Sequence, residues 1–352
     1  MNKFKNLLKK TILLAILIIS PILIFASEAG VIFLLIEPGS RPGGMGQAYV
    51  AQVDDGFAQF WNPGAMAFNR KNQFAGMHVN WFGALFDDMY YEYFGWNKYY
   101  PEMSGNLGVN VTFLTFGTQE RRGEDNELIG TFDSFDVSAG VSYGYQHSDN
   151  LGIGVNFKYI YSQLADYEHG ESTGKGNGYS FAFDIGLLQK NLFINGLNLG
   201  VNLQNIGPDI SYINNAQSDP LPMNLRLGLS YRIFADDYNK LTINGDMNKL
   251  LANNDWVLKR LITAWYDDGG FMSKIERETT IFGVGGEYVY WNLLSLRAGF
   301  LYDKNGARVG PSFGAGIQHT FPNGYHAFFN YAMEQAGELT DYNHTFSIGL
   351  DF

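Results

Sequence analysis

The stretch that decides the fold is Leu151-Gly-Ile-Gly-Val-Asn-Phe-Lys-Tyr-Ile-Tyr-Ser162, in which two kinds of side chain alternate. The odd positions from Leu151 to Tyr161 are apolar, whereas the even positions are mostly small or polar. Successive side chains of a strand point to opposite faces, so this alternation predicts a strand with one apolar face. The same pattern recurs around Val141 and Leu229 and continues almost to the last residue.

About fourteen segments of this kind follow one another, each of roughly ten residues, which is the length that a tilted strand needs to cross a bilayer. Their centres are Phe74, Tyr93, Val111, Val141, Phe157, Phe183, Val201, Leu229, Ile243, Gly285, Ala298, Ala315, Phe328 and Ile348. The predicted fold class is therefore all-β, a transmembrane antiparallel β-barrel of about fourteen strands.

The connections between these segments alternate in length. The short ones are 147–150, 235–239, 290–292 and 321–324. The long polar ones are 117–133, 164–177, 207–222, 248–277 and 334–343. An up-and-down barrel with short periplasmic turns and long extracellular loops has this rhythm, whereas a soluble β-sandwich has no reason to produce it.

Residues 1–26 have the pattern of a secretory signal peptide. Four lysines precede an apolar run from Thr11 to Phe25, and small residues follow the run. The run is shorter than the roughly 20 residues of a membrane-spanning helix, and nothing later in the chain exceeds it. We therefore expect export without a helical anchor, to the outer membrane of a Gram-negative-type bacterium and into contact with its lipid.

Composition argues against several classes of protein. The chain has no cysteine, which removes thiol nucleophiles, thiolate metal sites and lipid attachment through cysteine. A net charge of −11 argues against nucleic acid as a partner. The histidines lack metal-ligand spacing and no nucleophile elbow is present, so we expect no enzyme activity, no metal and no cofactor.

Residues 27–70 are predicted to form an N-terminal plug inside a barrel of residues 71–352. About fourteen strands leave a lumen that needs filling, and a segment rich in glycine and proline is too irregular to meet lipid unless the barrel encloses it. The candidate plug and ligand residues are Arg41, Gly44, Met45, Gly46, Asp54, Asp55, Trp61, Asn62 and Pro63.

Three physical expectations attach to the plug. Its glycines permit backbone conformations closed to other residues, and Pro63 fixes φ in a turn that Asn62 can cap. Arg41 can form ion pairs with Asp54 and Asp55 that tie the plug to the wall, or all three can be ordinary solvated charges. Turn-forming residues alone are equally compatible with a folded plug that has no ligand role.

The long connection 248–277 contains a candidate amphipathic helix that Asp255 could cap. Its apolar side includes Trp256, Leu261 and Trp265. Such a helix would either receive a partner at the barrel mouth or pack over its own loops.

The last strand has Phe346, Ile348, Leu350 and the terminal Phe352 on one face. A C-terminal aromatic residue on such a strand resembles the signal that barrel-assembly machinery reads.

The N-terminal region also resembles a known family. The pattern Arg41-x-x-Gly44-Met-Gly46-x-Ala48, the Asp54–Asp55 pair and Trp61-Asn-Pro63 are similar to the PorV/PorQ proteins, which are related to the FadL-type long-chain fatty acid transporters. Family members often have alanine where this chain has Gly64, which weakens assignment to a particular branch. The resemblance extends to the strand count and so covers nearly the whole mature chain.

The resemblance implies a component of type IX secretion. Such proteins hold or shuttle secreted cargo, recognise its C-terminal signal domain, and pass it to the translocon or attachment machinery. The alternative is a FadL-type channel, in which a hydrophobic ligand binds near the plug beside Trp61 and leaves through a gap in the wall. That alternative predicts an apolar pocket in the lumen. A purely structural barrel is a third reading.

Overall fold

The computed structural model describes residues 29–81, 88–123, 125–165, 176–212, 218–253, 255–267, 270–273, 279–337 and 342–352. The predicted signal peptide, residues 1–26, lies outside the described residues. No helix in the described part of the chain is long and apolar enough to cross a membrane.

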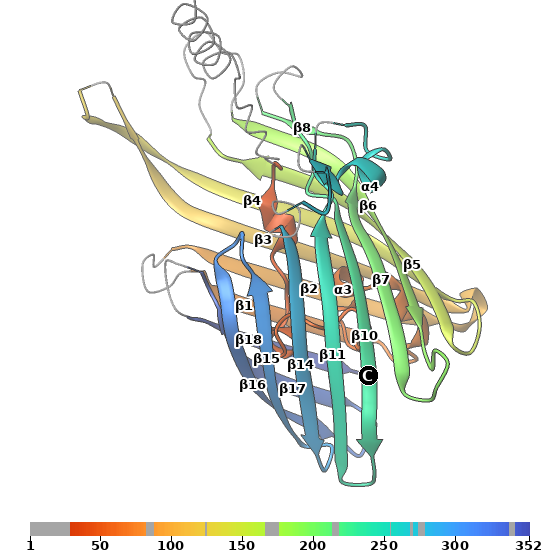
Figure 1. The fold of residues 1–352 in the computed structure, drawn as a ribbon. Coiled ribbons are helices and arrows are strands. Elements are labelled where there is room, and N and C mark those ends of the chain that lie inside the picture. Colours follow the sequence, from red (N-terminus) through yellow and green to blue (C-terminus); the bar gives the residue numbers. More distant parts are fainter. Residues whose placement is uncertain are drawn as a thin grey trace, which may run out of the picture.

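In the described residues, fourteen antiparallel strands close into one barrel (Figure 1). Each pairs with its neighbour along the chain, and the first strand closes the ring by pairing with the last. The strands are β1 Gln73–Asn80, β2 Tyr90–Tyr100, β3 Gly105–Arg122, β4 Leu128–Gln146, β5 Leu151–Gln163, β6 Asn177–Gln189, β7 Leu197–Ile206, β10 Asn224–Ala235, β11 Asn239–Leu250, β14 Thr280–Tyr290, β15 Leu294–Asp303, β16 Arg308–Thr320, β17 His326–Gln335 and β18 Tyr342–Asp351. Every predicted strand centre falls in its own strand, so the predicted barrel of about fourteen strands is confirmed.

The wall is apolar outside and polar or small inside. On β5, the side chains of Ile153, Val155 and Phe157 are exposed, whereas Asn156 and Lys158 are buried in the lumen. A water-soluble protein would bury the apolar set instead, so this inversion is typical of a wall that faces lipid.

The barrel has two different ends. We call the end with the connections β2–β3, β4–β5, β6–β7, β10–β11, β14–β15 and β16–β17 the turn end, and the opposite one the loop end. The loop end also carries β8 Ile210–Ser211, β9 Ser218–Asp219, α4 Arg260–Thr263, β12 Tyr266–Asp267 and β13 Gly270–Phe271. By the usual orientation of such barrels, the loop end faces outside and the turn end faces the periplasm.

Two expectations about the loops were wrong in detail. The predicted loop 117–133 is mostly strand, because β3 runs to Arg122 and β4 begins at Leu128, so that the paired hairpin projects beyond its neighbours (Figure 1). The residues of this hairpin are polar because water surrounds them, although their backbones are paired as strands. The predicted helix around Trp256–Trp265 is a single turn, α4, whose N-cap is Lys259 and which Asp255 does not cap.

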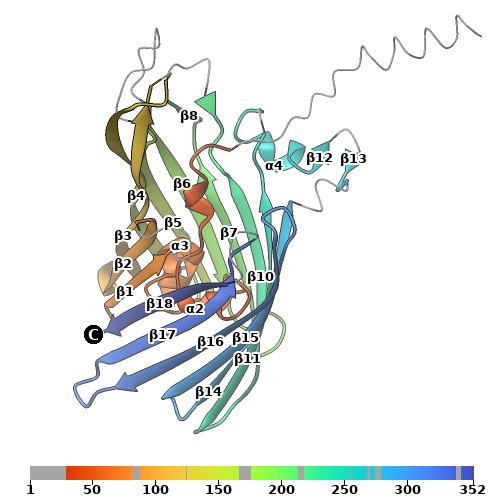
Figure 2. The same cartoon turned by 90° about the vertical axis from the view of Figure 1, so that its left-hand side faces the viewer.

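Residues 29–70 pass through the lumen as the helical turns η1 Ile32–Leu35, α2 Ser40–Gly43, α3 Ala58–Trp61 and η2 Pro63–Phe68 (Figure 2). The segment starts at the loop end, where the Gly30 N–H donates to the Pro220 carbonyl at 3.0 Å. It leaves at the turn end, where Asn72 and Phe352 exchange backbone hydrogen bonds of 2.9 Å. We call residues 29–70 the lumen segment.

Candidate functional site

The lumen segment lies directly on the backbone of the wall. Gly46 has φ +63, and a Cβ there would be 2.5 Å from the carbonyl oxygen of Phe300 on β15. A Cβ on Gly44 would be 2.8 Å from the Cα of Gly314 on β16. The Met45 side chain between them is fully buried. Position 46 therefore requires glycine both for its backbone conformation and because no Cβ fits there. Position 44 requires glycine because no Cβ fits there.

Arg41 joins the lumen segment to the wall. Its Nε and Nη2 donate to the two carboxylate oxygens of Glu287 on β14, both at 2.8 Å. Its Nη1 donates to Asp54 at 2.5 Å and lies 3.7 Å from Asp55. The expected pairs with Asp54 and Asp55 are thus formed within the segment, whereas the bond to the wall is made by Glu287.

Sequence reasoning missed Glu287 and its second partner. Arg297 on β15 donates from Nε to Glu287 at 2.8 Å and from Nη1 to Asn330 at 2.9 Å. A detectable signal existed, because Glu287 and Arg297 are charges at inward-facing positions of otherwise uncharged strand interiors. Two arginines sharing one buried carboxylate fix the segment against β14 and β15.

The electrostatics of the segment follow from its burial. Burial raises the pKa of Asp55 to about 6, although Arg41 opposes the shift, and the carboxylate accepts a 2.7 Å hydrogen bond from the Tyr49 hydroxyl. Burial alone would lower the pKa of Arg41, but Asp54 and Glu287 outweigh it and hold that pKa above its usual value. Arg41 is therefore charged at every physiological pH.

Asn62 and Pro63 form the turn that the sequence suggested. Pro63 is the first residue of η2, and the Asn62 Oδ1 accepts from the Gly64 N–H at 3.0 Å. The Asn62 Nδ2 also donates to the Val50 carbonyl at 3.0 Å and to the Leu187 carbonyl on β6 at 2.9 Å. One side chain therefore caps a helix and ties the segment to β6, away from the strand β14 that Arg41 contacts.

Trp61 lies inside the barrel and has no exposed surface. Its Nε1 donates to the Pro38 carbonyl at 2.8 Å, its ring packs edge-on against Tyr49, and the Arg226 guanidinium sits 4.8 Å from the ring centroid. The protein itself fills the surroundings of this side chain, which leaves no free face for a ligand.

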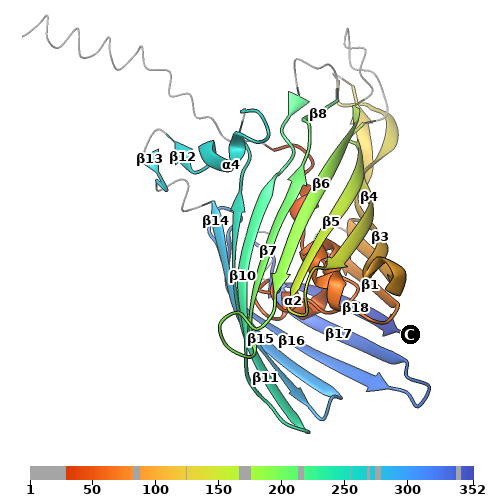
Figure 3. The ribbon, with the colours of Figure 1, turned by 90° about the vertical axis from the view of Figure 1, so that its right-hand side faces the viewer.

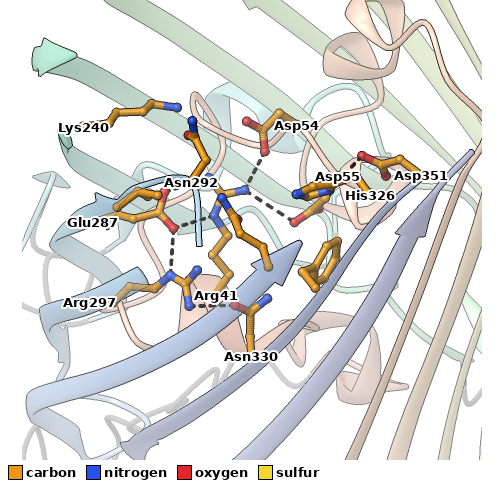
Figure 4. Close-up of a pocket in the computed structure, with 13 residues that line it drawn as sticks. Arg41, Asp54, Asp55, Lys240, Glu287, Asn292, Arg297, His326, Asn330 and Asp351 are labelled. Carbon is orange, nitrogen blue, oxygen red and sulfur yellow. Dashed lines mark hydrogen bonds and ion pairs between the residues drawn. The ribbon is translucent and has the colours of Figure 1, made fainter. Parts of the chain in front are cut away.

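A cavity of about 220 Å³ lies on the turn-end side of the lumen segment (Figure 4). Charged groups dominate its lining, among them Arg41, Asp54, Asp55, Lys240, Glu287 and Arg297. The FadL-type alternative requires an apolar pocket, and this cavity has the opposite character.

The segment that contains α4 packs against the outside of the wall. Val257 and Trp265 contact a buried cluster of Met223, Leu251 and Ala264. The same cluster includes outward-facing side chains of β7 and β10, namely Leu203, Ile206 and Leu225. Of the three residues predicted to meet a partner, Trp256 is 68% exposed, Leu261 is 37% exposed, and Trp265 is half-buried on the wall. Their partner role stays a prediction.

The end of the last strand lies on the outer wall. Phe346, Ile348 and Phe352 are exposed, and Leu350 is half-buried. All four lie on the lipid-facing side, as the alternation predicted, and their assembly role stays a prediction.

Comparison with known proteins gives two kinds of match. The model of the family "Type IX secretion system protein PorV" matches residues 26–255, which is more than half of the chain. No curated protein sequence matches.

Among solved structures, the toluene transporter TodX of Pseudomonas putida has a TM-score of 0.53 at 13% identity, covering 89% of this chain and 97% of TodX. The toluene transporter TbuX of Ralstonia pickettii has a TM-score of 0.52 at 12% identity, with 89% and 97% covered. At such identities the likeness establishes the fold alone.

Proposed function

The chain belongs to the family of the type IX secretion system protein PorV and lies in the outer membrane of a Gram-negative-type bacterium, and from this premise we propose that it receives secreted proteins at its loop end. In this role it holds the C-terminal signal domain of a secreted protein and passes it to the translocon or attachment machinery. The role is binding and transfer, and not catalysis.

The state of the lumen supports a role on the surface. Residues of the lumen segment lie inside the barrel and hold the wall through Arg41–Glu287 and Asn62–Leu187. The cavity beyond them is charged, and Trp61 is enclosed. An occupied lumen with a charged cavity favours a function carried out on the outer face over conduction of apolar molecules, and this observation carries the proposal.

The loop end offers a surface on which a protein could dock. The β3–β4 hairpin projects beyond the barrel, and Leu128 and Ile129 at its tip are both more than half exposed. Exposed apolar residues on a polar hairpin are typical of a contact site. We assign the first contact with cargo to this hairpin.

Affinity capture from outer membranes tests the proposal. A tagged chain should bring down secreted proteins that share a C-terminal domain, together with translocon or attachment proteins. Replacing residues 119–132 by an Asn-Gly turn, which joins the paired residues Thr118 and Asp133, should abolish capture. The matched control replaces the turn-end residues 148–150 by the same turn and should capture normally. Capture of no secreted protein by the unaltered chain would overturn the proposal.

A second function needs a test of its own, because two solved proteins of similar fold are toluene transporters. Under this reading, purified protein in lipid vesicles would speed the entry of toluene or a long-chain fatty acid. Because Trp61 is enclosed and the cavity is charged, we expect entry at the rate of protein-free vesicles. Entry faster than in protein-free vesicles would support the channel instead.

A further inference from the structure

The segment between β11 and β14 has two faces of different character. We call its described residues, 251–253, 255–267 and 270–273, the outer flap. One face packs on the wall, where Val257 and Trp265 pack against the same buried cluster as the outward side chains Leu203, Ile206 and Leu225. Outward side chains of this wall otherwise meet lipid. The outer flap is thus attached to the lipid-facing surface of the barrel.

The other face of the outer flap is apolar and uncovered. Trp256 is 68% exposed, Ile262 is 69% exposed and Phe271 is 63% exposed, and Leu258 and Tyr266 are more than half exposed. Phe271 and Tyr266 pack ring to ring at 5.2 Å, so the exposed rings form a patch. A patch of this kind in water is costly, at roughly 25 cal/mol for each Å² left exposed.

The position of the outer flap identifies what covers this face. Figures 2 and 3 show α4, β12 and β13 projecting sideways from the wall, away from the barrel axis. The adjoining wall carries exposed apolar residues up to the loop end, where Phe282 pairs with Tyr302. The patch therefore continues the lipid-facing belt at its outer rim.

We propose that the outer flap lies in the outer leaflet of the membrane, with Trp256, Ile262 and Phe271 at the boundary between acyl chains and head groups. Tryptophan and tyrosine favour that boundary because each has an apolar ring and a polar tip. Charged groups beside these side chains suit the head groups, since Lys259 and Asp255 form an ion pair of 2.6 Å. The proposal depends on the membrane location of the barrel and not on its role in secretion.

The absence of cysteine makes a direct test possible, because any introduced cysteine is the only site that a thiol-reactive label can modify. Trp256→Cys, Ile262→Cys and Phe271→Cys would each be given a nitroxide label and reconstituted in phosphatidylcholine vesicles. The measurement compares collision of the label with oxygen, which concentrates in lipid, and with a water-soluble nickel complex. Val284→Cys on the outer wall is the lipid reference, and Leu128→Cys on the β3–β4 hairpin is the apolar control in water, each more than half exposed.

We expect the three flap labels to match Val284→Cys, with an oxygen-to-nickel ratio several-fold above that of Leu128→Cys. Flap labels that match Leu128→Cys in vesicles would overturn the proposal. Protection that appears in native outer membranes but not in pure lipid would also overturn it and would assign the patch to a protein. Both outcomes are independent of cargo capture, so a failure of the secretion role would not be mistaken for a failure of this inference.

Discussion

The lumen segment and the outer flap both pack on the wall, one on its inner surface and one on its outer surface, by different chemistry. The lumen segment is held by bonds between charged and amide groups, such as Arg41–Glu287, and by backbone contact at glycines. The outer flap is held by an apolar cluster and leaves aromatic side chains uncovered. The polar face of the wall selects a polar partner and the apolar face an apolar one, so the side of the wall on which a segment packs can be read from its contacts.

The largest effect is expected from Gly46→Val, which tests the backbone contact in the lumen. The new side chain would need a φ of +63 and would overlap the Phe300 carbonyl, at a cost of about 5 kcal/mol or more. The lumen segment should detach, and single-channel recordings should detect frequent large openings. Gly130→Val is the control, because nothing lies within 4 Å of a Cβ at that position. Equal conductance of the two variants would contradict the assignment.

Glu287→Ala tests the buried ion pairs. It leaves Arg41 and Arg297 without their shared carboxylate, which typically costs about 3–5 kcal/mol for a buried charge. The thermal unfolding midpoint in detergent should drop clearly. Glu120→Ala breaks an exposed pair with Arg122 and should cost under about 1 kcal/mol. If both variants unfold at the same temperature, the lumen pairs do not hold the segment.

Asp55 makes the lumen contact depend on pH. Because the folded-state pKa of about 6 lies above the unfolded value of 3.8, the folded state binds the proton more tightly. This stabilisation is present below about pH 4 and is lost as the pH rises to about 6, a change of up to about 3 kcal/mol. The unfolding midpoint of the unaltered chain should fall relative to that of Asp55→Asn as the pH rises from about 4 to about 6, and the two should run parallel above that range. Parallel curves from pH 3.5 to 8 would refute the shift.

The smallest effect is expected in the outer flap. Trp265→Ala removes a half-buried ring from the cluster on the wall, and amide hydrogen exchange in residues 255–267 should quicken about tenfold, or about 1.4 kcal/mol. In detergent, Trp256→Ala should leave exchange unchanged, because that ring is mostly exposed. Equal exchange in the two variants would argue that the flap is not docked on the wall.

The strands could be predicted because their signal is local. Apolar and polar side chains alternate between adjacent residues, and this alternation predicts every strand of the barrel, including β18. The turn at Asn62 and Pro63 was predictable for the same reason, since cap and helix are neighbours in sequence. Features that a few consecutive residues determine are visible without a structure.

Features that join distant residues were not predictable. Arg41 and Glu287 are separated by 246 positions, and alternation identifies Glu287 as inward-facing without naming its partner. The amphipathic pattern around Trp265 also does not show that this side chain docks on the outside of the wall. An apolar face can pack equally well on a loop, on a partner or on the barrel surface. The β3–β4 hairpin could not be recognised from its sequence either, because a paired hairpin in water has the same polar composition as a loop.

The path of the lumen segment sets an order of assembly. The chain runs from the loop end to the turn end inside a ring that is sealed where β1 meets β18, beside the Asn72–Phe352 contact. The segment packs closely on the wall at Gly44 and Gly46, so we expect residues 29–70 to be in place before β1 pairs with β18. We expect a separate peptide of residues 29–70, added after the barrel has closed, not to enter the lumen. The lumen would then remain permeable to ions.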